Sequence, residues 1–110
     1  MTLLRIKPLS INVAFQGRRF KTEDYKSYER EMFILLPKTL KIPKGKMKLS
    51  IVFGFSNKAS DIDNCCKLLI DILQKKYGFN DKNIYRLEVE KKIVKKGSEY
   101  LDFEISEITA

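Results

Sequence analysis

Apolar and polar residues alternate along several stretches of the chain, and this period of two is typical of half-buried strands. Pro8 falls within the first stretch, so we expect that strand to be divided or to lie at a sheet edge. A glycine turn over residues 95–99 separates the last two stretches and predicts a hairpin between them. The predicted strands cover residues 3–15, a short segment after a turn within residues 15–20, and residues 48–56, 84–95 and 100–105.

Two other stretches have helical patterns. In the first, Thr22 is placed as an N-cap with two acids behind it, which predicts a helix from about residue 23 to residue 36. The second helix lies within residues 61–77 and ends at Gly78. The sequence therefore predicts one α+β domain over residues 1–110, with a small mixed sheet of about five short strands and two helices.

The second helix combines a charged stripe with a wide apolar face. At 100° per residue, four polar residues that begin with Asp63 fall on one side. The apolar arc spans about 200°, which is more than one core contact usually needs. Either the helix lies between two layers of the fold, or part of this arc contacts a second subunit. The stripe contains Asp63, Lys67, Asp71 and Gln74, and the arc contains Cys65, Cys66, Leu68, Leu69, Ile70, Ile72 and Leu73.

Two aspartates, Asp61 and Asp63, lie at the start of this helix, where backbone N–H groups favour negative charge. One cap needs only one acceptor, and two close carboxylates repel unless a cation lies between them. A third acid, Asp81, follows the helix and joins the pair only if the next strand runs back toward the helix start. Three carboxylates at a strand–helix junction are typical of a site for Mg²⁺, or alternatively Mn²⁺, that cuts phosphodiesters.

Lys67 lies one turn into the helix, on the same face as Asp63. There it can stabilise charge that develops on a scissile phosphate. It can also form an ion pair with Asp63 or Asp71, which is worth about 0.3–0.5 kcal/mol on a helix surface. The residues alone leave both roles open.

The composition narrows the chemistry. The chain has no histidine, which excludes histidine-based triads and Cys/His zinc sites and leaves oxygen ligands for any metal. Its two cysteines are neighbours and form no disulfide framework. No apolar run reaches the roughly 20 residues that a membrane span needs, and the N-terminus has no signal-peptide pattern. We therefore expect an intracellular protein that is not attached to a membrane.

The net charge of +8 is unevenly distributed. Residues 1–58 contain 13 basic and 4 acidic residues, a balance of +9, whereas residues 59–110 contain 9 basic and 10 acidic residues, a balance of −1. Five of the lysines lie within residues 37–48, a segment with two prolines that we expect to be a loop. A basic half favours a polyanionic partner, with nucleic acid first, and an ordinary basic surface is the alternative.

Together these residues resemble the RusA family of Holliday junction resolvases. The run "DIDNCCKLLIDIL" from Asp61, the loop "GFNDKNI" from Gly78 and a strand that reaches Lys91 match the family's motifs. The N-terminal "KPLSIN" is similar to the family's opening, so the resemblance covers nearly the whole chain. The sequence departs from the pattern at Asn80, where many members have a second aspartate.

The resemblance implies a homodimeric, Mg²⁺-dependent endonuclease that nicks four-way DNA junctions symmetrically, in the cytoplasm of a bacterium or encoded by a phage. It implies that Asp61, Asp63 and Asp81 bind the metal and that Lys67 is the catalytic lysine. One alternative is a non-catalytic nucleic-acid-binding module whose aspartates only cap the helix, and another is a family copy that binds junctions without cutting them. The residues expected to contact DNA are Asn12, Arg18, Arg19, Lys44, Lys46 and Lys91.

Overall fold

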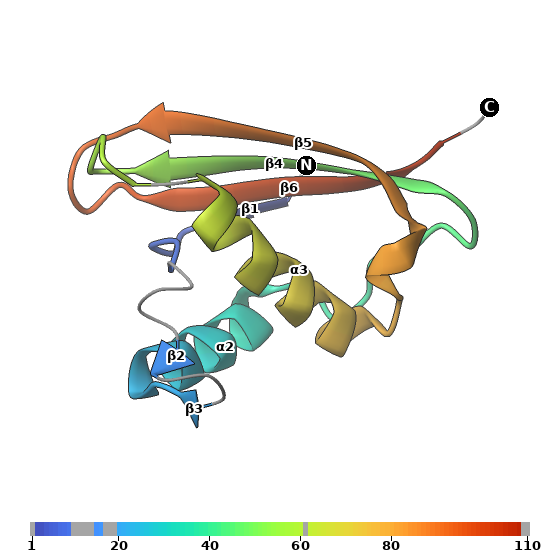
Figure 1. Cartoon of the computed structure of the whole chain (residues 1–110), viewed down its shortest axis with the longest axis horizontal. Helices are drawn as coiled ribbons and strands as arrows, with labels where there is room; N and C mark the ends of the chain where they lie inside the picture. The colour runs from blue at the N-terminus through green and yellow to red at the C-terminus, as the bar shows by residue number, and fades with distance from the viewer. Residues whose placement is uncertain (1, 10–14, 17–19, 61, 109–110) are drawn as a thin grey trace.

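The computed structural model describes residues 2–9, 15–16, 20–60 and 62–108, and Figure 1 draws the whole chain. The described residues form two helices and six strands, which confirms the predicted α+β class. In chain order the elements are β1 (Thr2–Leu4), β2 (Phe15–Gln16), β3 (Phe20–Lys21), α2 (Glu23–Leu35), β4 (Met47–Phe55), α3 (Ile62–Tyr77), the 3-10 helix η1 (Asp81–Asn83), β5 (Ile84–Ile93) and β6 (Tyr100–Glu107).

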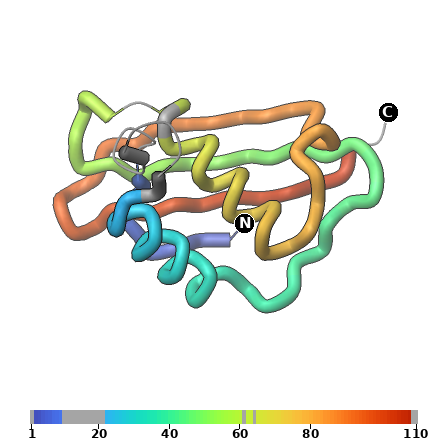
Figure 2. Tube along the Cα trace, turned by 60° about the horizontal axis from the view of Figure 1, so that its bottom comes forward, coloured from blue at the N-terminus to red at the C-terminus, as the bar shows by residue number. Residues whose placement is uncertain are grey.

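Four strands form a mixed sheet in the order β1-β6-β4-β5, and β2 and β3 form a separate antiparallel pair. Strand β4 is parallel to β5 and antiparallel to β6, and β6 is antiparallel to β1. Both helices lie on one face of this sheet, with α3 against the sheet and α2 alongside α3 (Figures 1 and 2). Helix α3 is therefore in contact with two layers, as one of the two explanations for its wide apolar arc requires.

The predicted hairpin between the last two strands is wrong. A turn is present, with Gly97 at φ 93°, but β5 and β6 do not pair, because β4 lies between them. Strand β4 buries Leu49, Ile51 and Phe53 almost completely and hydrogen-bonds on both of its edges. The central position of a sheet favours the strand that buries the most apolar side chains, which here is β4. A local glycine turn does not determine which strand lies between the two that it connects.

The β4–α3–β5 segment fixes which residues lie at each end of α3. Parallel neighbours require a crossover connection, and here α3 supplies it. Because Ile84 pairs with Met47, β5 begins beside the start of β4, away from the point where β4 leads into α3. The segment just before β5 therefore lies at the C-terminal end of α3.

The predicted helix boundaries are confirmed, whereas the first strand is shorter than predicted. The Thr22 hydroxyl oxygen accepts a hydrogen bond from the backbone N–H of Tyr25 at 3.2 Å, and α3 is followed by Gly78 at φ 75°. Strand β1 ends at Leu4, whose carbonyl oxygen accepts a hydrogen bond from the Ile6 N–H at 3.0 Å. This tight turn ends the strand before Pro8, and residues 5–9 do not continue it, whereas residues 10–14 of the predicted strand lie outside the described residues.

The core lies between α3, the sheet and α2. Each fully buried large side chain contributes about 1.5–3 kcal/mol relative to its exposed state, so the apolar face of α3 and the sheet that it covers contribute most of the packing. No helix in the described part of the chain is long and apolar enough to cross a membrane. Core residues include Leu68, Leu69, Ile72 and Leu73 of α3, Tyr25 and Met32 of α2, and Leu49, Ile51, Phe53, Leu101 and Phe103 of the sheet.

Candidate active site

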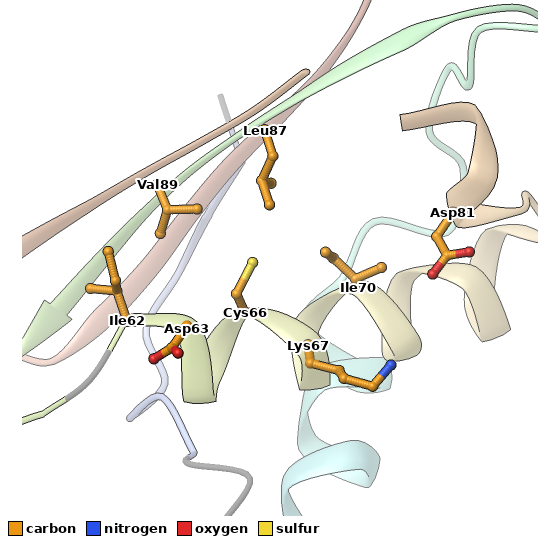
Figure 3. Close-up of a pocket in the computed structure, with 8 residues that line it drawn as sticks. All are labelled: Ile62, Asp63, Cys66, Lys67, Ile70, Asp81, Leu87 and Val89. Atoms are coloured by element: carbon orange, nitrogen blue, oxygen red, sulfur yellow. The ribbon is translucent and has the colours of Figure 1, made fainter. Parts of the chain in front are cut away.

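An open groove of about 360 Å³ runs along α3 beside strand β5. Its wall on the sheet side is apolar, and its helix side carries charged residues (Figure 3). Three of the four residues with predicted catalytic roles line it, and the fourth, Asp61, lies outside the described residues. The lining consists of Ile62, Asp63, Cys66, Lys67, Ile70, Asp81, Leu87 and Val89.

Asp63 lies in the first turn of α3, at one end of the groove. It is exposed, and the unpaired N–H groups of a helix start favour its negative charge. None of the ion pairs between described residues involves Asp63 or Asp81. Both carboxylates are therefore available to a cation from outside the chain.

Lys67 pairs with Asp71 rather than with Asp63. The Lys67 Nζ atom lies 3.7 Å from the Asp71 Oδ1 atom, and the two side chains are 64% and 31% exposed. An exposed pair four residues apart on a helix contributes only about 0.3–0.5 kcal/mol. The ammonium is therefore held weakly and can exchange Asp71 for a phosphate without a large change in folding free energy.

Asp81 lies beyond the C-terminal end of α3, as the first residue of η1 (Figure 3). Its backbone N–H donates a hydrogen bond to the Gln74 Oε1 atom at 2.9 Å. Asp63 and Gln74 are about three helical turns apart, or about 16 Å at 1.5 Å per residue. The segment after Gly78 therefore does not bring Asp81 back to the start of α3.

A single Mg²⁺ with ligands at about 2.1 Å cannot bind carboxylates that are so far apart, and neither can a pair of ions about 4 Å apart. Within one chain, Asp63 and Asp81 therefore do not converge on a metal. No group of three His, Cys, Asp or Glu side chains suited to a metal occurs among the residues that the structure describes. The predicted metal-binding roles stay predictions, and their geometry must involve more than these two residues of one chain.

The remaining polar atom of the groove wall is the Cys66 thiol, which points toward Leu87 and Val89 (Figure 3). Burial raises the pKa of the Cys66 thiol, and the Asp63 carboxylate raises it further. A thiol that keeps its proton is neither a nucleophile nor a good metal ligand. The reactive groups of the groove are therefore its carboxylates and its lysine.

The sequence matches the family model described as "Endodeoxyribonuclease RusA" over residues 11–100, which is 90 of the 110 residues. The chain belongs to the RusA endodeoxyribonuclease family. It is thus an enzyme of the Holliday junction resolvase class that acts on branched DNA. A comparison with curated proteins gives no match.

Within this RusA family chain, the departure at Asn80 has a structural explanation. The Asn80 Oδ1 atom caps η1 by accepting a hydrogen bond from the backbone N–H of Lys82 at 3.0 Å. Asparagine and aspartate are equally good caps, so this position orders the turn that carries Asp81 with either residue.

The basic residues predicted to contact DNA lie in different parts of this RusA domain. Lys44 and Lys46 are exposed on the loop before β4, and the Lys46 Nζ atom lies 4.9 Å from the centroid of the Tyr85 ring at the start of β5. This loop is thus close to the Asp81 end of the groove. The Lys91 ammonium instead contacts backbone carbonyls near the start of α3. Asn12, Arg18 and Arg19 lie outside the described residues.

Two contacts of the site were missed at the level of sequence. Gln74 was recognised only as part of a polar stripe, although its side chain binds the backbone of Asp81. Lys91 was considered only as a DNA contact, which stays a prediction, and the hydrogen bonds from its ammonium to the loop before α3 were not anticipated. In the sequence, only the position of Gln74 and Lys91, on elements next to the acidic residues, hints at these hydrogen bonds. The partners are backbone atoms of other segments, so no residue type marks them.

Proposed function

We propose that this RusA family nuclease cuts four-way junctions with a divalent cation, Mg²⁺ or Mn²⁺, held by Asp61, Asp63 and Asp81, and that each site takes these residues from two copies of the chain. The observation that carries this proposal is that Asp63 and Asp81 line one groove from opposite ends. A groove with half of a site at each end becomes complete when a second copy lies across it in the opposite direction.

The donor set fits a hard cation. Asp63 and Asp81 offer exposed carboxylate oxygens, the ligands that Mg²⁺ prefers, and the chain has no histidine to attract softer metals. The protonated Cys66 thiol does not compete for the ion. When bound, such a cation polarises the phosphodiester and lowers the pKa of an attacking water.

A symmetric dimer on the α3–β5 face supports this arrangement. Strand β5 is at one end of the sheet order, so one edge of its ten residues has no partner among the described strands. Tyr85, Leu87 and Ile93 of β5 are large apolar side chains that are 46–64% exposed. An exposed apolar edge of this length is a typical interface. A two-fold axis near the middle of the groove would put Asp81 of one copy beside Asp63 of the other.

The cationic residues have two separate roles in this proposal. Lys67 leaves its weak pair with Asp71 and stabilises the charge that develops on the scissile phosphate. Lysines of residues 37–48 hold the DNA arms through their phosphates, so binding weakens as salt concentration rises. Shape and backbone contacts then select a branched substrate.

The substitution Asp63→Asn tests the catalytic role. It keeps the size of the side chain and a hydrogen-bonding oxygen in the first turn of α3 but removes the charge that a metal needs. We expect this variant to bind a synthetic four-way junction with wild-type affinity and to cut it at least about 100-fold more slowly in Mg²⁺. The matched control is Asp24→Asn, the same change in the first turn of α2, which should cut normally.

Gel assays of junction cleavage and of junction binding without Mg²⁺ give both quantities. If Asp63→Asn cuts at the wild-type rate, Asp63 only stabilises the first turn of α3 and the proposed site is wrong. If the wild-type chain binds junctions but never cuts them with Mg²⁺ or Mn²⁺, the chain has the binding function alone.

A further inference from the structure

Lys91 of β5 reaches the loop that leads into α3. The Lys91 Nζ atom donates hydrogen bonds to the carbonyl oxygens of Lys58 at 2.9 Å and of Ser60 at 3.0 Å. Lys91 pairs in register with Phe53 of β4 and has the same strand parity as Val89, which lines the groove. The ammonium thus connects the rigid sheet to the backbone just before the acidic pair.

The position of these two carbonyls gives the contact its consequence. The Ser60 carbonyl belongs to the planar peptide group that also contains the backbone nitrogen and Cα of Asp61. A hydrogen bond that fixes this oxygen therefore fixes the backbone just before α3, whose first turn carries Asp63. Charged donors make the stronger hydrogen bonds to carbonyl groups, and this donor makes two.

The other hydrogen bonds of this loop do not fix it to the sheet. The Ala59 N–H donates to Asn57 Oδ1 at 2.9 Å and the Ser60 N–H donates to the Asn57 carbonyl at 3.2 Å, so both bonds are internal to the loop. The Ser56 hydroxyl donates to Glu99 at 2.8 Å, which holds only the first residue of the loop. Among the hydrogen bonds of the residues that the structure describes, only those from Lys91 tie the second half of this loop to a strand.

We propose that Lys91 is a positioning residue: it clamps the loop before α3 so that Asp63, in the first turn of that helix, is held in a geometry that binds the divalent cation. Lys91 acts through the loop backbone and not through a phosphate. This inference rests on the proposed function, because it assigns the clamp's purpose to the metal site. Whether Lys91 orders this loop can be measured independently of catalysis.

The experiment uses the full chain with Lys91→Met, which keeps the aliphatic stem and removes the ammonium. Lys91→Arg keeps a cationic donor, and Lys92→Met is the control, because Lys92 neighbours Lys91 and only approaches Glu90 at 3.9 Å. Amide hydrogen exchange at Ala59 and Ser60 reports the loop directly. Junction cleavage over a range of Mg²⁺ concentrations and junction binding without Mg²⁺ report its effect.

For Lys91→Met we expect exchange at Ala59 and Ser60 to rise about 5- to 10-fold, because two bonds that order the loop are lost. The Mg²⁺ concentration for half-maximal cleavage should rise about 5-fold or more, while junction affinity and the KM for the junction stay within about 2-fold of Lys92→Met. Lys91→Arg should restore most of the protection and of the Mg²⁺ dependence.

Unchanged exchange at Ala59 and Ser60 in Lys91→Met overturns the clamp. Faster exchange with an unchanged Mg²⁺ dependence overturns its assigned purpose. Suppose instead that Lys91→Met loses much more junction affinity than Lys92→Met while amide exchange at Ala59 and Ser60 stays slow. That result would show that Lys91 contacts DNA and does not clamp the loop. If Lys91→Met does not fold, Lys91→Gln replaces it in the same measurements. A wild-type chain that never cuts is a failure of the proposed function, and the exchange result still decides the clamp.

Discussion

Gln74 shows how one side chain sets the position of a residue seven places further along the chain. Its Oε1 atom accepts the hydrogen bond from the Asp81 N–H at 2.9 Å, and its Nε2 atom donates to the Ile70 carbonyl at 3.4 Å. The side chain thus bridges α3 and η1 and holds Asp81 at its end of the groove. Asp81 is a turn residue, so without this bridge its orientation would be poorly fixed.

Replacing Gln74 with leucine therefore tests the positioning of Asp81 separately from the stability of the fold. Gln74→Leu keeps the size of the side chain and removes the acceptor, so we expect the free energy of unfolding to fall by no more than about 1 kcal/mol. Cleavage should fall by about 10-fold or more, because small misplacements of catalytic groups are costly. Gln74→Glu keeps an acceptor oxygen and should cut closer to the wild-type rate. Wild-type cleavage by Gln74→Leu would show that the bridge is dispensable.

At the residue scale, the sequence identifies the acids and the lysine but not their partners. Asp63, Lys67 and Asp71 are correctly assigned to one stripe, because helical period and local charge determine that stripe. The contacts of Lys91 and Gln74 are with backbone atoms, and any residue type supplies those. The sequence pattern therefore contains no sign of them.

Among the elements, the Tyr100 ring of β6 lies against Gly54 of β4. A Cβ added at Gly54 would overlap the ring of Tyr100, the residue with which Gly54 pairs. We expect Gly54→Ala to lower the free energy of unfolding by about 1–3 kcal/mol, because the ring must move out of its place. The control is Gly45→Ala, where an added Cβ meets nothing within 4 Å and the change should stay within about 0.5 kcal/mol. Urea unfolding measures both, and equal effects would contradict this packing.

The connection between β5 and β6 contains a carboxylate that should make stability depend on acid pH. Hydrogen bonds from the backbone and from the Ser56 hydroxyl lower the pKa of Glu99 from its usual 4.5. Because the folded pKa is below the unfolded one, the stabilisation is present above about pH 4.5 and is lost as the pH falls through the folded pKa.

We therefore expect Glu99→Gln to lower the Tm relative to wild type at pH 7, and the difference to shrink as the pH falls below 4.5. Glu104→Gln, on the exposed side of β6, is the control for loss of an acidic residue. A difference between wild type and Glu99→Gln that is constant across this range would mean that the Glu99 carboxylate contributes nothing through its charge.

Element boundaries follow from local chemistry, whereas strand order does not. Thr22 and Gly78 fix the ends of α2 and α3 through a side-chain acceptor and a positive φ, and both are visible in the sequence. The hairpin was predicted from the turn at Gly97, which is local, but β4 separates the two strands. That choice depends on how much apolar surface β4 buries, which is a property of the assembled sheet.

At the scale of the whole molecule, the distance of Asp81 from the other acids also depends on strand direction, which local sequence does not determine. The sequence marks Asp81 as a site residue, but its distance from Asp63 depends on the direction of β5. Since β5 is parallel to β4, the crossover puts the two acids at opposite ends of α3. The chain therefore carries two half-sites on one groove, beside an exposed apolar strand, and a basic first half to bind phosphates. A dimer reconciles these features, because an antiparallel second copy joins complementary half-sites.

The most direct test of this account mixes two inactive variants. In a dimer with shared sites, co-expressed Asp63→Asn and Asp81→Asn chains form heterodimers in which one site has both wild-type residues. Each variant alone should fail to cut a four-way junction, whereas the equal mixture should nick it at about a quarter of the wild-type number of sites. The matched control is a chain with both substitutions mixed equally with wild type, which should leave about a quarter of the sites active rather than half. A mixture of the single variants that stays as inactive as each alone would contradict the account, because the acids would then act within one chain.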